Sequence, residues 1–111
     1  MKKLLKAGRH FRVRGIKAIV AKSEPENRRL EALCRGRETV YISDSHPGPS
    51  VALFGGSEAD RLDLLSRILT RYSKPCAPGP YNVREVSPGG ERAVTVPENP
   101  DFQEVERGLL R

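Results

Sequence analysis

The sequence predicts an α+β domain, with two helices packed on mainly antiparallel strands in the order ββαββαββ and a short C-terminal helix as a further possibility. Three observations favour this class. Segments rich in β-branched residues come in pairs, glycine and proline turns punctuate them, and two longer stretches repeat apolar residues at helical spacing. A chain of 111 residues can bury one core without disulfides or metal. We expect a single domain with its core over residues 8–99, a basic segment over 1–7 and a tail over 100–111.

The first pair of strands is predicted to carry a basic face. Within residues 10–14, apolar side chains alternate with basic ones, so Arg12 and Arg14 are expected to share one side of the sheet. A glycine turn then leads into a second strand over residues 16–21, which contains Lys17. This face can bind phosphate, or it can be an ordinary solvated surface, and the sequence leaves both interpretations open.

A helix is predicted after this hairpin. Ser23 and Glu26 form a capping-box pattern at its start, and Gly36 suits a left-handed helix end. Asn27 lies on the same side as Leu30, which is mainly apolar. Its amide can satisfy the backbone of a nearby loop, or it can be presented to a base or a ribose.

Two further strands, over residues 39–43 and 51–54, precede the longest predicted helix. This helix is expected over residues 58–72 with Ser57 as its N-cap. Its apolar stripe predicts a buried face that contains Leu62, Leu65, Ile68, Leu69 and Tyr72. The glycine turn before Ser57 also offers backbone N–H groups to a phosphate, with a plain capped turn as the alternative.

The same helix has a second, basic stripe made of Arg67, Arg71 and Lys74. These side chains are neighbours on a helix surface and can contact phosphates. The alternative is a solvated face in which Asp63 pairs with Arg67.

A final hairpin is predicted from residues 81–86 and 92–96, after a proline-rich segment over 74–80 that cannot be helical. The tail can form one short helix over residues 101–110. Such a helix would have Phe102, Val105 and Leu109 on one side.

Positive charge is concentrated at the start of the chain. The first 22 residues carry eight basic side chains and no acidic one, whereas the remainder carries 12 basic and 14 acidic side chains. A concentrated basic region is typical of proteins that bind a polyanion, most often a nucleic acid. The alternative is a poorly ordered N-terminus that aids solubility. Three Phe, three Tyr and no Trp are too few for a large base-stacking platform.

Several function classes lack support in the sequence. No apolar run suits a signal peptide or a membrane span, so we expect a cytoplasmic protein that does not contact a membrane. Cys34 and Cys76 have no His or Cys at ligand spacing, which argues against a metal site and favours reduced thiols. One polar turn contains Asp44, His46 and Ser50, but a turn seldom arranges three such groups for catalysis. We expect no enzyme activity and no cofactor.

Several segments, in their order and spacing, resemble one known family. These segments are IVAKSEPENRRLEAL, SDSHPGPSVALF, LLSRILTRYSKP and YNVREVSPGGERAVTVPENP. The chain resembles NFACT-R, the RNA-binding module of ribosome quality-control NFACT proteins. It is most similar to the second subtype, which occurs alone or fused to tRNA-thiouridine synthase-like proteins. The resemblance spans about residues 8–99 and implies RNA binding, with tRNA or a tRNA–ribosome complex favoured and the ribosome or a thiouridine synthase-like protein as further partners.

We therefore predict a non-enzymatic RNA-binding module. The expected contacts are basic groups of the first hairpin and second helix, joined by polar loop groups: Arg12, Arg14, Lys17, Lys22, Asn27, His46, Arg67, Arg71 and Lys74. One alternative is an accessory subunit of a thiouridine-forming tRNA modification system, in which Cys76 suits sulfur transfer better than Cys34. The other alternative is a protein–protein adaptor that uses the face of Phe102, Val105 and Leu109.

Overall fold

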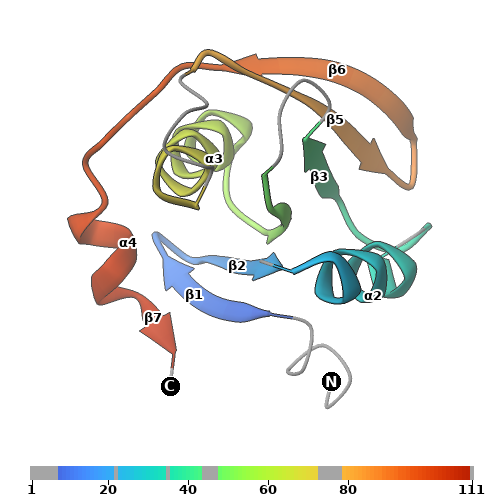
Figure 1. The fold of residues 1–111 in the computed structure, drawn as a ribbon, viewed down its shortest axis with the longest axis horizontal. Coiled ribbons are helices and arrows are strands. Elements are labelled where there is room, and N and C mark those ends of the chain that lie inside the picture. The colour runs from blue at the N-terminus through green and yellow to red at the C-terminus, as the bar shows by residue number, and fades with distance from the viewer. Residues whose placement is uncertain (1–7, 22, 35, 44–47, 73–78, 111) are drawn as a thin grey trace.

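One antiparallel sheet curves around the longest helix in the computed structural model, which describes residues 8–21, 23–34, 36–43, 48–72 and 79–110 (Figure 1). Within these ranges the seven strands are β1 (Arg9–Val13), β2 (Ile16–Ala21), β3 (Val40–Ser43), β4 (Ser50–Phe54), β5 (Tyr81–Ser87), β6 (Gly90–Val96) and β7 (Leu109–Leu110). The helices are α2 (Glu24–Cys34), α3 (Glu58–Tyr72) and α4 (Gln103–Arg107), and none in the described part is long and apolar enough to cross a bilayer. The predicted α+β class and the order of the elements are confirmed.

The strand order in the sheet is β6-β5-β3-β4-β2-β1-β7, and every neighbouring pair is antiparallel. Hairpins join β1 to β2 and β5 to β6, as the glycine turns predict. The first hairpin is attached to the rest of the sheet through the β2–β4 ladder, which runs from Lys17 opposite Phe54 to Ala21 opposite Ser50. This ladder fixes which residues of the two hairpin strands share a face.

Helix α3 fills the inside of the curve. Figure 1 shows it lying between the β5–β6 hairpin and the β1–β2 hairpin. Leu65, Ile68 and Leu69 are fully buried, as the predicted stripe requires, but Leu64 is buried as well. Strands pack on α3 from more than one side, so its buried face is wider than a single apolar stripe.

Helix α2 covers the opposite face of the sheet. Its Leu30 and Cys34 pack in a second, smaller cluster with Ile19, Val40 and Ala52. Side chains of a strand alternate between the two faces of a sheet. The two helices therefore stabilise the same central strands from opposite sides.

Both long helices begin at the serine caps that the sequence predicts. The Ser57 hydroxyl accepts a hydrogen bond from the Asp60 N–H at 3.1 Å, and the Ser23 hydroxyl accepts one from the Glu26 N–H at 3.3 Å. Each contact satisfies an N–H group that a helix start leaves without a partner. After α2, Gly36 has a φ of 72°, the left-handed conformation expected at a helix end.

The C-terminal segment differs from the expected single helix over residues 101–110. It forms the short helix α4 and then the strand β7, which pairs with β1 and covers that edge of the sheet. Val105 is fully buried, and Phe102 and Leu109 pack against the core around α3. Of the apolar face that the adaptor hypothesis needs, Val105 is therefore inaccessible and Phe102 and Leu109 are only partly exposed.

Candidate nucleic-acid interface

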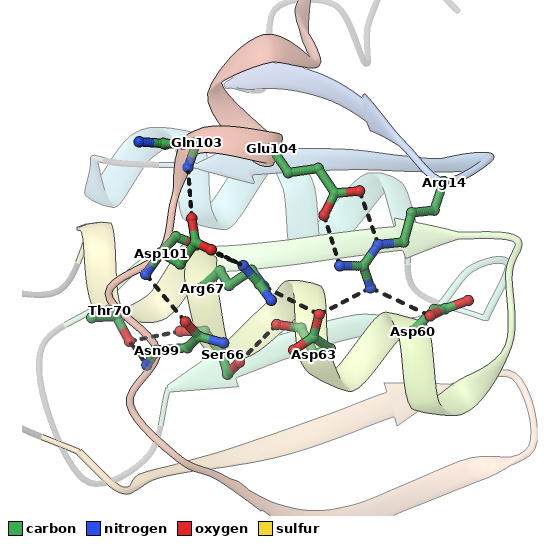
Figure 2. Close-up of polar contacts among 10 residues, drawn as sticks. All are labelled: Arg14, Asp60, Asp63, Ser66, Arg67, Thr70, Asn99, Asp101, Gln103 and Glu104. Carbon is green, nitrogen blue, oxygen red and sulfur yellow. Dashed lines mark hydrogen bonds and ion pairs between the residues drawn. The ribbon is translucent and has the colours of Figure 1, made fainter.

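Arg14 lies in the β1–β2 turn and joins α3 to α4 (Figure 2). Its guanidinium lies 2.7 Å from a Glu104 oxygen, 2.9 Å from an Asp63 oxygen and 3.3 Å from an Asp60 oxygen. Arg14 has a φ of 53°, the left-handed conformation, so the alternation of strand side chains ends one residue before it. The expectation that Arg12 and Arg14 share a face of the sheet is therefore wrong.

Arg67 belongs to the same network of charges, and Figure 2 shows both arginines converging on Asp63. Its Nε donates to Asp63 at 3.1 Å, and its Nη1 donates to the backbone carbonyl of Asp101 at 3.0 Å. Burial alone would raise the pKa of Asp63, but hydrogen bonds from Arg14 and Arg67 outweigh it and lower that pKa. Of the two interpretations of the basic stripe, the pairing of Arg67 with Asp63 is observed. Both guanidinium groups already have anionic partners.

Two cations lie on the other face of the first hairpin, where Arg12 is exposed and Lys17 is half-buried. Arg12 in β1 lies directly opposite Lys17 in β2, and Lys17 lies opposite Phe54 in β4. We call Arg12, Lys17 and Phe54 the hairpin row. Within the part of the chain that the structure describes, no ion pair joins Arg12 or Lys17 to a carboxylate. Like charges directly opposite in a ladder repel each other across a Cβ separation of about 5 Å, so an anion placed between them would be stabilising.

Ion pairs offset much of the remaining positive charge. Arg28, Arg84 and Arg92 each pair with at least one carboxylate, and Arg92 joins Glu85 at 2.7 Å. Among the described residues, the cations without an ion pair are Arg9, Arg12, Lys17, Arg29, Arg37, Arg61, Arg71 and Arg107. The first hairpin contributes more of these cations than any other hairpin or helix of the described chain.

Of the two interpretations of Asn27, the structure shows the one in which its amide satisfies the backbone of a nearby segment. Its side-chain oxygen accepts a hydrogen bond from the Ser50 N–H at 3.0 Å, and the Ser50 hydroxyl donates to Glu31 at 2.8 Å. These contacts tie the start of β4 to α2. The remaining predicted groups of the loops and helix ends lie outside the described residues: Lys22, Asp44, His46 and Lys74.

Cys34 is fully buried, and its surroundings disfavour reactivity. Burial, with a further contribution from the charge of Glu38, raises the pKa of its thiol to about 11. The reactive thiolate is therefore scarce at neutral pH. Cys76 lies outside the described residues, and no cluster of His, Cys, Asp and Glu within them could hold a metal ion.

Comparison with known families identifies the chain. The family model described as the NFACT protein RNA binding domain matches residues 8–105. The chain belongs to this family. The fold is also similar to the solved structure of the C-terminal part of the fibronectin/fibrinogen-binding protein from Streptococcus suis, with a TM-score of 0.70 and 13% identity. That match covers 93% of this chain and 49% of the other, so the chain spans about half of that structure.

A comparison with curated proteins finds no match for the chain. Membership of the NFACT RNA-binding family makes the chain an RNA-binding module, with RNA as its partner. At 13% identity, the streptococcal structure supports the fold alone. The surface that an NFACT domain of this kind presents to RNA must therefore be found in the chain's own geometry.

The NFACT domain also has a hollow that the sequence did not predict. It opens beside β1, α3 and α4, with a volume of about 360 Å³, and its lining includes Arg9, Phe11, Arg71, Tyr72, Phe102 and Glu106. Three of the few aromatic residues of the chain meet there, from segments far apart in the sequence. Because the chain has few aromatic residues, three of them in one place would have been a signal for a site. The sequence could not show this, because these residues meet only when the C-terminal segment returns to β1.

Proposed function

We propose that this NFACT domain binds tRNA, alone or in a tRNA–ribosome complex, through the hairpin row and without catalysing a reaction. The hairpin row is the observation that supports this surface most strongly. Arg12 and Lys17 face each other, and among the described residues neither forms an ion pair with a carboxylate. By contrast, Arg14 is held by three carboxylates and stabilises the fold.

The physical basis of the proposed contact is electrostatic. A phosphate near the row attracts both cations and reduces the repulsion between them. Contacts of this type position an RNA without reading its bases, so double-stranded regions of tRNA are suitable targets. Arg71 is exposed and is proposed as a further phosphate contact, together with Lys22 and Lys74. His46 is proposed as a polar contact, and so is the side-chain NH2 group of Asn27, whose oxygen accepts from the Ser50 N–H.

No specific observation favours either alternative function, the sulfur-transfer subunit or the protein–protein adaptor. Sulfur transfer needs an accessible thiol with a lowered pKa; Cys34 is buried with a raised one, and Cys76 lies outside the described residues. An adaptor surface on the C-terminal segment would have to expose Val105, which is fully buried. Charge and family both favour RNA instead.

The test is the affinity of the protein for a tRNA transcript at fixed ionic strength, measured by fluorescence anisotropy. Arg12→Gln and Lys17→Gln each remove one proposed phosphate contact, so each is expected to weaken binding by about fivefold. Arg84→Gln is the matched control, because it removes the same charge from an exposed side chain on β5, well away from β1 in the strand order. This control is expected to bind within about twofold of the wild-type protein.

Two results would contradict the proposed surface. If Arg84→Gln weakens binding as much as Arg12→Gln, affinity follows net charge rather than a site. If neither hairpin variant changes affinity, the RNA contacts another face. Equal affinity for tRNA and for duplex DNA of similar length would contradict the choice of tRNA.

A further inference from the structure

We infer that the hollow beside β1, α3 and α4 binds one unpaired nucleotide of the RNA, with its base on the aromatic wall and a flanking phosphate at the arginine rim. This base subsite rests on the proposed RNA-binding function and adds a second, distinct mode of contact to the hairpin row. The row attracts backbone phosphates of any sequence, whereas the hollow would select a nucleotide that is free of base pairing.

The wall is built from three aromatic rings. Phe102 lies 5.7 Å from Tyr72 and 6.1 Å from Phe11 between ring centroids, with interplanar angles of 82° and 83°. Phe11 is fully buried and supports the other two, which are half-buried and so still reach solvent. A rigid, partly exposed aromatic group is a surface on which any base can stack.

The rim of the hollow is cationic. The guanidinium carbon of Arg71 lies 5.7 Å from the centroid of the Phe102 ring, and Arg9 lines the same hollow from β1. Both side chains are exposed and, within the described residues, without an ion pair. A planar guanidinium already placed against a ring can stack on a base or bind a phosphate with little further loss of freedom.

The pKa of Tyr72 responds to the charged side chains that line the hollow. Burial raises the pKa of Tyr72, Arg9 and Arg71 lower it, and Glu106 raises it. Two arginines against one glutamate leave this hollow with a net positive charge, which suits a nucleotide.

Glu106 gives the hollow a means to distinguish bases. Its carboxylate accepts hydrogen bonds and can receive one from the exocyclic amino group of adenine, cytosine or guanine, which uracil lacks. The volume of about 360 Å³ is at the small end of ligand pockets. The hollow therefore suits a single nucleotide.

The experiment compares two RNA probes: a stem-loop with a short adenosine loop, and a blunt RNA duplex with the same number of phosphates. Phe102→Leu removes the stacking ring but keeps an apolar side chain, and Arg71→Gln removes the rim charge. Phe102→Leu is expected to weaken binding of the stem-loop by about tenfold and to leave the duplex nearly unchanged. Arg71→Gln, which also removes a backbone phosphate contact, is expected to weaken the stem-loop by about tenfold and the duplex by clearly less. Arg107→Gln, an exposed arginine of α4 outside the lining, is the matched control and is expected to change neither.

A second comparison uses Glu106→Gln with adenosine and uridine loops, since this variant should reduce the preference for adenosine. Thermal melts of all variants establish that they are folded. If Phe102→Leu and Arg71→Gln leave stem-loop binding unchanged, or weaken both probes equally, the base subsite is excluded. The RNA-binding function would still stand if Arg12→Gln weakens both probes, whereas failure of the wild-type protein to bind either probe would exclude both.

Discussion

Replacing Arg14 by alanine is expected to destabilise the fold rather than weaken RNA binding. The substitution removes three contacts, at 2.7, 2.9 and 3.3 Å, that join the β1–β2 turn to α3 and α4. The partners are about one-third to one-half exposed, so each pair contributes about 0.2–1 kcal/mol and the three together about 1–2 kcal/mol. The carboxylates left behind also repel one another, which places the loss toward the upper end of this range.

The backbone at Arg14 provides a second, separable effect. Its φ of 53° is a left-handed conformation that residues other than glycine adopt at a cost of about 1 kcal/mol or more. Arg14→Gly loses the same ion pairs as Arg14→Ala but relieves this strain. The glycine variant is therefore expected to be more stable than the alanine variant by about 1 kcal/mol.

Urea denaturation followed by circular dichroism measures both differences, and pH separates the charge effect from the backbone effect. The hydrogen bond from Arg14 lowers the pKa of Glu104, and Arg14 and Arg67 lower that of Asp63 against the effect of burial. Stability from a lowered carboxylate pKa is present above its ordinary value and is lost as pH falls through the lowered value. The gap between the wild-type protein and Arg14→Ala should therefore narrow steadily as the pH falls below about 4, the ordinary carboxyl pKa, while the gap between the two variants should persist.

One result would refute the structural role of Arg14. If Arg14→Ala unfolds at the same urea concentration as the wild-type protein but binds tRNA about tenfold more weakly, Arg14 contacts RNA and does not stabilise the fold through its ion pairs.

Two further predictions concern buried groups. Asn27→Ala leaves the N–H of the buried Ser50 without its acceptor and is expected to lower the free energy of unfolding by about 1–2 kcal/mol. Asn27→Asp keeps an acceptor and should cost less, so equal losses in urea denaturation would contradict the contact. Cys34, with its pKa raised to about 11 by burial, is expected to react with a thiol reagent at pH 8 only after unfolding in a Cys76→Ser protein. Rapid labelling of the native protein would instead show an accessible thiol and revive the sulfur-transfer alternative.

Local signals were sufficient to predict most of the fold. Caps such as Ser23 and Ser57 act within one helical turn, and strand alternation is a property of neighbouring residues, so both can be read from the sequence. The buried face of α3 was predicted too narrowly, because Leu64 is covered by strands that pack from a second side. The C-terminal helix was predicted too long, because the pairing of Leu109 with Phe11 depends on an edge strand that is distant in the chain.

The site was harder to predict than the fold because charge partners are set by tertiary contacts. Arg12 and Arg14 are equally basic and only two positions apart, yet Arg12 has no ion pair among the described residues whereas Arg14 is held by carboxylates such as Glu104. The difference arises from a positive φ at Arg14 and from a carboxylate, Glu104, that lies 90 positions away in the chain. Neither the backbone conformation of Arg14 nor its distant carboxylate partner can be read from a local sequence pattern. Counting basic residues therefore pointed to the hairpin but overestimated how many of its cations lack a carboxylate partner.

The central claim is that the hairpin row contacts RNA phosphates, and the salt dependence of tRNA binding tests it most directly. Each phosphate contact adds about 0.7–0.9 to the slope of log affinity against log salt concentration. The double variant of Arg12→Gln and Lys17→Gln should therefore have a slope that is shallower than that of the wild-type protein by about 1.4–1.8, while Arg84→Gln keeps the wild-type slope. A double variant with the wild-type slope would show that these two cations release no counterions from RNA and would contradict the claim.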